Sequence, residues 1–158
     1  MRWLLAAFLV FVFLIATRQD CRADVSSMIG IGKNSPFEKF VAVNISSPGQ
    51  VFAKIEGGGW LDYAEGHNHS FFGSVAVGLR AKSNDGFYIE TSFGPALISK
   101  TDSVLGSNKQ FCFSFGAGIN DRRGVKIGGA YYHISDASIW PGPNLGRDFL
   151  GIVVGYSF

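Results

Sequence analysis

Charged side chains are scarce in this sequence. Asp, Glu, Lys and Arg make up 16% of its 158 residues, whereas hydrophobic residues make up 47% and Phe alone occurs 15 times. A disordered chain has few aromatic residues and high charge, and a coiled coil has long runs rich in Ala, Glu, Lys and Leu, so this composition disfavours both. With no sustained helical repeat and 21 glycines, the chain is expected to form one β-rich domain.

Long apolar runs are missing too, except at the N-terminus. Arg2 precedes an unbroken apolar segment over 3–16, which is shorter than the roughly 20 residues that a membrane-spanning helix needs. A basic start, a short apolar core and small residues at the −3 and −1 positions of a cleavage site after Ala23 are typical of a secretory signal. We therefore expect residues 1–23 to be a signal peptide and 24–158 to be the exported domain.

Cysteine and net charge are also low. Cleavage after Ala23 leaves Cys112 as the sole thiol, so the exported domain has no partner for an intramolecular disulfide. The residues before Cys21 lack the small and apolar character of a lipidation site, which disfavours a lipoprotein. The exported domain carries as many basic as acidic side chains, so its charge gives no indication of a nucleic-acid partner.

Alternation of apolar with small or polar residues recurs along the exported domain. It is sharpest over 109–119, where Phe111, Phe113 and Phe115 share one face. Residues two apart in a strand face the same side, so the pattern predicts a strand with one apolar face. The same pattern predicts seven further strands over 25–32, 37–46, 51–59, 71–80, 87–97, 125–134 and 150–158.

An apolar face on every strand fits a soluble barrel with that face inward or a membrane barrel with that face toward lipid. Export and the aromatic C-terminal residue, Phe158, favour the membrane. The polar face carries charges that could pair inside a narrow lumen: Lys54, Glu56, Arg80, Glu90 and Lys126. We predict an all-β fold, an eight-stranded antiparallel transmembrane β-barrel of the outer-membrane type, with a soluble periplasmic barrel as the alternative.

The lengths of the predicted connections alternate. Outer-membrane barrels have short periplasmic turns and longer outer loops. The short connections, expected in the periplasm, are 47–50, 82–86 and 120–124, whereas 61–70, 99–108 and 136–147 have at least ten residues each. Residues 136–147 are therefore expected at the outer surface.

Three residues of that region could carry chemistry. His133 and Ser135 follow the apolar side chains of their strand on the same face, and Asp148 lies two residues before Leu150 on the apolar face of the last strand. These two strands are expected to be antiparallel neighbours, so the three side chains should converge on the outside of the barrel near its outer rim. A serine nucleophile, a histidine base and an aspartate that orients the imidazole would make an acyl-transfer triad.

The surrounding sequence resembles a known family. Residues 132–137, Tyr-His-Ile-Ser-Asp-Ala, are similar to a His-x-Ser-Asn-Ala motif, and 144–148, Asn-Leu-Gly-Arg-Asp, are similar to an Asn-x-Gly-x-Glu motif. Residues 93–99, 105–118 and 155–158 are similar as well. Over residues 85–158 the chain resembles the outer-membrane lipid A 3-O-deacylases, eight-stranded barrels that remove an ester-linked acyl chain from lipopolysaccharide.

The resemblance implies roles for individual residues. His133 is the base, Ser135 the nucleophile and Asp148 the acid, while Asn144 helps to form the oxyanion hole beside Asp136 and Gly146. It implies a bacterial outer-membrane esterase that acts on lipid A without a metal or cofactor. Whether the barrel forms a homodimer stays open.

Two residues depart from the family pattern. Asp136 stands where the family has Asn, which we expect to place a negative charge beside the developing oxyanion and to oppose its stabilisation. Asp148 is one methylene shorter than the family's Glu. The alternative function is therefore a non-catalytic small outer-membrane barrel, structural or surface-binding, including a degenerate deacylase.

Other chemistry-bearing residues have simpler explanations. His67 and His69 lack a clear third and fourth metal ligand, so we expect a solvated loop there, and Cys112 is expected to pack inside the barrel. An aromatic belt at the membrane interface accounts for most of the aromatic residues that could contact acyl chains: Trp60, Tyr63, Tyr131, Tyr132 and Trp140.

Overall fold

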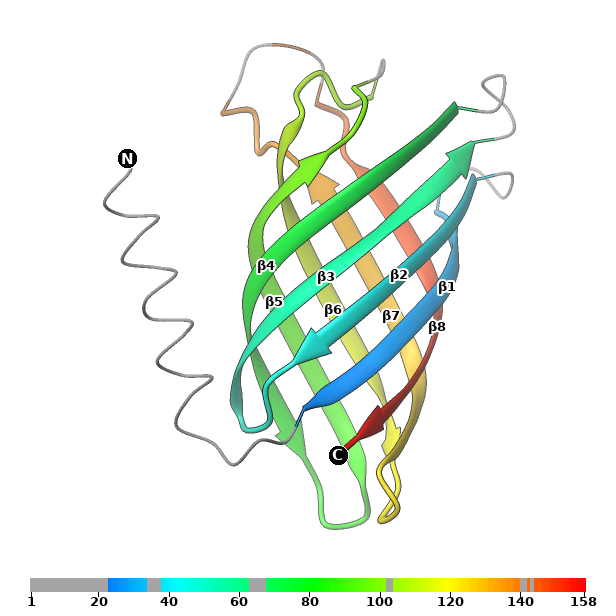
Figure 1. Ribbon diagram of the computed structural model, residues 1–158, viewed down its shortest axis with the longest axis vertical. Helices are drawn as coiled ribbons and strands as arrows, with labels where there is room; N and C mark the ends of the chain where they lie inside the picture. The colour runs from blue at the N-terminus through cyan, green and yellow to red at the C-terminus, as the bar shows by residue number, and fades with distance from the viewer. Residues whose placement is uncertain (1–22, 34–37, 63–67, 102–103, 140–141, 143) are drawn as a thin grey trace.

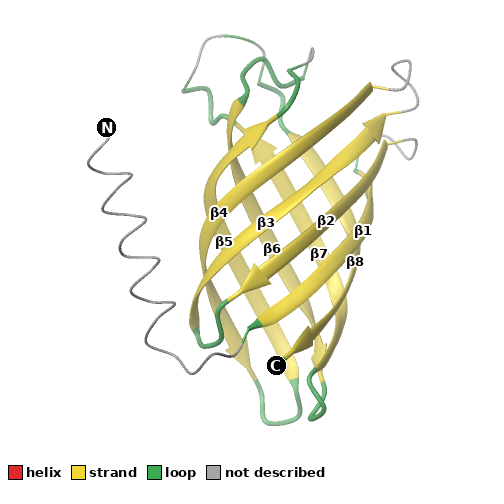
Figure 2. Cartoon of the chain, viewed as in Figure 1, coloured by secondary structure: helices red, strands yellow, loops and turns green. Residues whose placement is uncertain are grey.

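The protein is a closed antiparallel barrel of eight strands (Figures 1 and 2). The computed structural model describes residues 23–33, 38–62, 68–101, 104–139, 142 and 144–158. The strands are β1 (Asp24–Gly32), β2 (Glu38–Ser46), β3 (Val51–Asp62), β4 (Asn68–Lys82), β5 (Phe87–Ile98), β6 (Lys109–Asn120), β7 (Val125–Ser135) and β8 (Arg147–Ser157). Each strand pairs with the next, and β8 pairs with β1. Within the described residues, no helix has the length and apolar character needed to cross a membrane.

The predicted fold class is confirmed, and all eight predicted strands are present in the expected order. The predicted signal peptide lies outside the described residues, apart from Ala23. The prediction of a ten-residue loop over 61–70 is wrong, because β3 extends to Asp62 and β4 begins at Asn68, which leaves a shorter connection. Glycines 57–59 have no side chains to show an alternation, which is why sequence patterning ended this strand too early.

The two ends of the barrel differ. The turns 47–50, 83–86 and 121–124 lie at the end where β1 begins and β8 finishes (Figure 1). The backbone N–H of Phe158 donates to the carbonyl of Ala23 at this end, at 3.0 Å. The longest connections, 99–108 and 136–146, lie at the opposite end, which we call the outer end.

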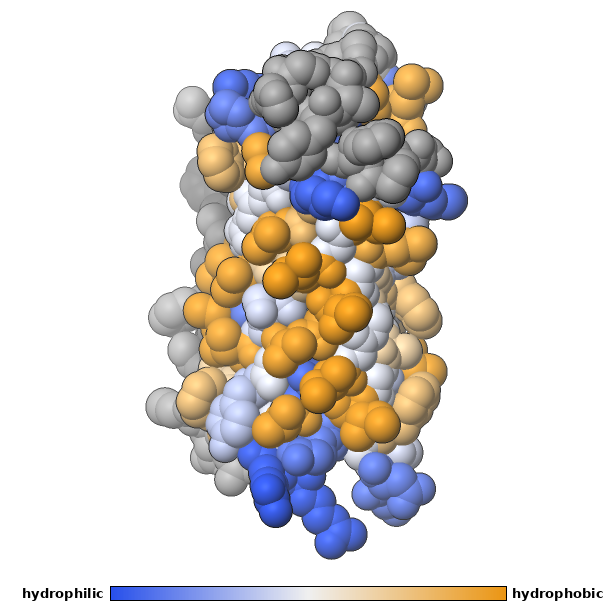
Figure 3. All heavy atoms as spheres, turned by 90° about the vertical axis from the view of Figure 1, so that its right-hand side faces the viewer, coloured by the Kyte–Doolittle hydropathy of each residue, from blue (hydrophilic) through white to orange (hydrophobic). Residues whose placement is uncertain are grey.

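The outer wall of the barrel is apolar. Figure 3 shows large hydrophobic side chains around the middle of one face, with hydrophilic residues below them. Phe113 and Phe115 face outward, which contradicts the soluble-barrel alternative. Exposed apolar side chains come from every strand and include Ile29, Val43, Ile55, Phe71, Phe93, Ile119, Ile127 and Ile152. Such a wall requires lipid as its solvent.

Charged residues fill the middle of the lumen. Lys54 forms an ion pair with Glu56 at 2.9 Å, and both side chains are buried. The hydroxyls of Ser74 and Tyr132 donate to the two oxygens of Glu56, at 2.7 and 2.8 Å. The two charges of this pair thus compensate each other, and Glu56 has two further hydrogen bonds, as a low-dielectric interior demands.

A second network occupies the lumen near the short turns. Glu90 accepts from Arg80 at 2.9 Å and from Lys126 at 2.7 Å, and Arg80 also pairs with Asp24. The expectation that the polar-face charges pair inside the barrel is therefore confirmed. These bonds connect β1, β4, β5 and β7 across the lumen.

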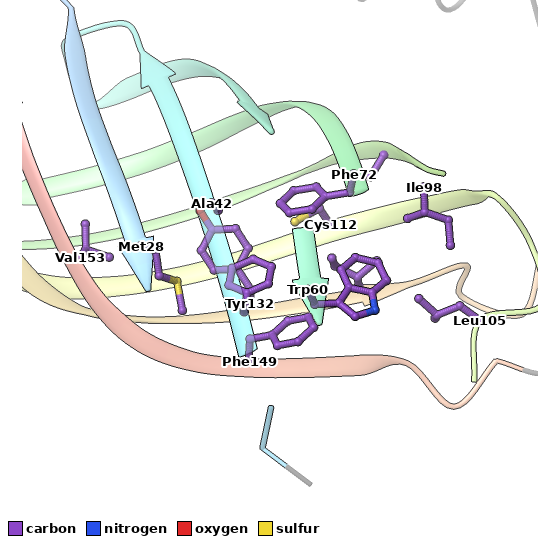
Figure 4. Packing of buried hydrophobic residues seen from close by; sticks show 13 residues of the cluster. Met28, Ala42, Trp60, Phe72, Ile98, Leu105, Cys112, Tyr132, Phe149 and Val153 are labelled. Carbon is purple, nitrogen blue, oxygen red and sulfur yellow. The ribbon is translucent and has the colours of Figure 1, made fainter. Parts of the chain in front are cut away.

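An aromatic cluster fills the lumen toward the outer end (Figure 4). Phe40 stacks on Phe149 with ring centroids 4.2 Å apart, and Trp60 and Tyr132 pack around this pair. The assignment of Trp60 and Tyr132 to an interfacial belt is wrong, because their parity places them inside. Tyr63 and Trp140 lie outside the described residues. Since Tyr132 and Phe149 belong to β7 and β8, this packing holds the two strands that carry the site.

The lumenal ion pair gives a stability prediction. We expect Glu56→Gln to lower the free energy of unfolding by about 3 kcal/mol, because it leaves the buried Lys54 ammonium without its counter-charge. Denaturant titration of the barrel in detergent measures the loss. The control is Lys54→Met combined with Glu56→Gln, which removes both charges and leaves an amide oxygen to accept from one of the two hydroxyls of Ser74 and Tyr132 and an NH₂ group to donate to the other. An equal or larger loss in this double variant would contradict the explanation.

Candidate active site

Three polar side chains meet on the outer wall near the outer end of β7 and β8. His133 lies opposite Asp148 in the strand register, and its Nδ1 is 2.7 Å from Asp148 Oδ1. Its Nε2 is 2.9 Å from Ser135 Oγ. The structure thus brings together the three residues that the sequence analysis selected, with the imidazole between the hydroxyl and the carboxylate.

Alternation along the two strands sets this arrangement. Ile134 and Phe149 are fully buried in the lumen, and Tyr132 is 3% exposed. Side chains alternate between the two faces of a strand, so His133, which lies between Tyr132 and Ile134, points outward. Its side chain is 36% exposed. The hydrophobic packing of the lumen therefore fixes where the polar groups on the wall lie.

Two further residues contact Asp148, and the sequence analysis gave them no role in the site. The Tyr131 hydroxyl donates to Asp148 Oδ1 at 2.6 Å. The Lys33 ammonium lies 3.8 Å from Asp148 Oδ2, and the Lys33 backbone N–H donates to the Asp148 carbonyl at 2.8 Å. Tyr131 could have been found from its parity, because it lies two residues before His133. Lys33 had no such signal, since its position depends on the closure of β8 against β1.

Asn144 is anchored beside the nucleophile. Its side-chain oxygen accepts from the backbone N–H of Asp136, the residue after Ser135, at 3.2 Å. Its backbone forms a β-bridge with Leu105. Its amide nitrogen is 3.5 Å from Ser138 Oγ. The side chain thus carries an N–H donor within the loop that follows the nucleophile.

Asp136 does not place its charge where the sequence analysis expected it. Its side chain is fully buried and continues the inward series of Tyr132 and Ile134, on the face opposite to Ser135. Its Oδ1 accepts from the backbone N–H of Ser138 at 2.8 Å, and its Oδ2 has no hydrogen-bond partner among the described residues. The group of this residue that lies in the site is its backbone N–H.

Gly146 lies against the imidazole. Its φ is +69°, and a Cβ at this position would lie 2.7 Å from His133 Cε1. Only glycine adopts this backbone conformation without strain and also leaves room for the ring. Gly146 therefore determines how closely the loop approaches His133.

The remaining candidates lie away from this cluster. His69 is 3.5 Å from Lys100 Nζ, and His67 lies outside the described residues. Among the residues that the structure describes, no group of three or more His, Cys, Asp or Glu side chains could hold a metal ion. Cys112 is 1% exposed inside the lumen, which confirms its packing role.

Comparison of the sequence with family models finds a match over residues 38–157 to the family described as lipid A 3-O-deacylase, PagL. The chain belongs to this family. The search of curated proteins finds no match. The family match covers β2 to β8, and with the apolar wall it places this deacylase-family barrel in the outer membrane.

Solved structures share the fold. The crystal structure of the outer-membrane enzyme PagL is 21% identical, with a TM-score of 0.70, over 84% of this chain and 98% of that one. The N-terminal β-barrel domain of OprF from Pseudomonas aeruginosa is 14% identical, with a TM-score of 0.63, over 87% and 97%. Ail from Yersinia pestis, in a phospholipid bilayer nanodisc, is 13% identical, with a TM-score of 0.55, over 88% and 100%. At these identities the three likenesses support the barrel fold alone.

Gly146 provides a test of the site geometry in this deacylase-family barrel. We expect Gly146→Ala to reduce ester hydrolysis at least tenfold, because the new Cβ displaces the His133 ring and adds strain of about 1 kcal/mol at a positive φ. Hydrolysis of a fatty-acyl ester in detergent measures the rate. The control is Gly73→Ala on the outer wall of β4, where a Cβ meets nothing within 4 Å. Equal rates in both variants would show that Gly146 does not hold the imidazole in place.

Proposed function

We propose that this protein is an outer-membrane esterase that hydrolyses an ester-linked acyl chain of lipid A through Ser135, His133 and Asp148. The observation that carries this proposal is the continuous contact from Asp148 Oδ1 through both ring nitrogens of His133 to Ser135 Oγ, at 2.7 and 2.9 Å. Membership of the lipid A 3-O-deacylase family supports the substrate class and the 3-O position.

In the first step, Ser135 Oγ attacks the ester carbonyl carbon and His133 Nε2 takes its proton. Asp148 accepts a hydrogen bond from Nδ1–H, which keeps Nε2 available as the base and stabilises the imidazolium that forms. The tetrahedral intermediate collapses when Nε2–H returns the proton to the leaving sugar oxygen. Water, activated by the same nitrogen, then hydrolyses the acyl-serine and releases the fatty acid.

The oxyanion needs donors close to Ser135. We assign this role to the side-chain amide of Asn144, because the backbone N–H groups of Asp136 and Ser138 already donate to Asn144 Oδ1 and Asp136 Oδ1. The hydrogen bond from the Asp136 N–H to Asn144 Oδ1 directs the carbonyl end of the amide toward the backbone, so its NH₂ group is the end available to an anion.

The position of the site on the wall suits a lipid substrate. His133 and Asp148 lie outside a lumen that is occupied by aromatic and charged side chains. An acyl chain can therefore reach Ser135 along the apolar wall while it stays in the bilayer. A site inside the lumen would require the chain to leave lipid, at a cost of about 0.8 kcal/mol for each CH₂ group exposed to water.

Substitution of the nucleophile tests the proposal. We expect the refolded protein to remove one hydroxyacyl chain from lipid A of added lipopolysaccharide, and Ser135→Ala to lower this rate by at least about 1,000-fold because no acyl-serine can form. Mass spectrometry of the lipid A measures the product. The control is Ser27→Ala, which removes an exposed hydroxyl from β1. Undiminished deacylation by Ser135→Ala would overturn the proposed nucleophile.

Asp136 gives a separate prediction. The Asp136 carboxylate lies on the lumen side of the wall, opposite to Ser135, so its charge is directed away from the oxyanion and we expect Asp136→Asn to keep kcat within about twofold of the parent. An Asn side chain at this position can still accept from the Ser138 N–H, so the loop should keep its shape. The measurement compares kcat of the two proteins in the same detergent. If both are folded and neither changes lipid A, the non-catalytic barrel becomes the better explanation.

A further inference from the structure

We propose that Tyr131 is a positioning residue that holds the Asp148 carboxylate on His133 and away from Lys33. The inference rests on the proposed function, because it concerns the acid of the same triad. Its basis is the set of three groups around one short carboxylate: the phenol of Tyr131, the imidazole of His133 and the ammonium of Lys33.

Between them, the three groups contact both oxygens of the Asp148 carboxylate. Tyr131 donates to Oδ1 at 2.6 Å, and His133 Nδ1 contacts the same oxygen at 2.7 Å. Lys33 Nζ lies nearer to Oδ2, at 3.8 Å, and its side chain is 56% exposed. Two donors therefore hold the oxygen that serves the imidazole, while an exposed surface cation attracts the other oxygen.

Asp148 needs such a tether because of the competition with Lys33. A neutral imidazole N–H is a weaker partner for a carboxylate than an ammonium group is. Rotation of the carboxylate toward Lys33 would leave His133 without its acceptor, and the ring would lose its orientation and its preferred tautomer. The hydrogen bond from Tyr131 opposes this rotation.

The strand register explains how Tyr131 reaches the carboxylate. Tyr131 lies on the same face of β7 as His133 and opposite Leu150, so Asp148 is its diagonal neighbour on β8. A diagonal neighbour is within reach of a long aromatic side chain. The Tyr131 ring also packs edge-on against Phe113, with centroids 6.5 Å apart, which restrains the phenol.

Tyr131→Phe tests the role, since it keeps the ring and removes only the hydroxyl. Loss of a hydrogen bond to a charged group predicts a fall in kcat of about tenfold or more, with KM within about twofold of the parent. The matched control is Tyr156→Phe, which removes an outward hydroxyl from the far end of β8, where the ring contacts Phe158. We expect this control to keep the kcat of the parent.

Lys33→Met separates positioning from a structural effect. With the competing ammonium removed, kcat of the Tyr131→Phe, Lys33→Met double variant should return to within about threefold of Lys33→Met alone. A merely structural role of the hydroxyl would leave the defect unchanged. Heat-modifiable migration on a gel confirms that each variant forms the barrel.

The outcomes distinguish this inference from the proposed function. The inference is overturned if Tyr131→Phe keeps the kcat of Tyr156→Phe while Ser135→Ala is inactive, or if Lys33→Met does not restore the double variant. If Ser135→Ala stays active, it is the proposed triad that fails.

Discussion

Closure of an eight-stranded sheet around a filled lumen is the constraint on which the rest of this molecule depends. Once the aromatic cluster around Phe40 and Phe149 and the ion pair of Lys54 and Glu56 occupy the interior, every strand is held in one register. A slip of one residue would turn the apolar wall inward and the charges into lipid. The packing of the lumen thus determines the chemistry of the outer surface as well as the stability of the barrel.

The candidate site uses that constraint directly. Tyr131, His133 and Ser135 occupy successive outward positions on β7, and Asp148 lies across from His133 on β8. Their spacing comes from sheet geometry, in which neighbouring strands are about 4.8 Å apart. A rigid sheet can hold a proton-transfer chain at the edge of the bilayer without a cleft, which suits a substrate that is already confined to the membrane.

Particular residues show where sequence reasoning succeeded and where it stopped. Apolar residues alternate with small or polar residues without interruption over 109–119, so that strand was predicted within one residue of its bounds. The glycines at 57–59 interrupt the same signal, and the strand through Trp60 was cut short. Asp136 was expected to face the oxyanion because it follows Ser135, but its burial continues the inward parity of Ile134.

The sequence by itself determined the barrel, its inside and outside, and the three residues that meet on β7 and β8, because period-two patterning and motif spacing are local properties of the chain. Only the tertiary structure decided what surrounds Asp148. Lys33 reaches it through the pairing of β8 with β1, and Asn144 is held by a bridge to Leu105 from another loop. Contacts between residues that are distant in the chain depend on barrel closure and loop conformation, which no periodic pattern encodes.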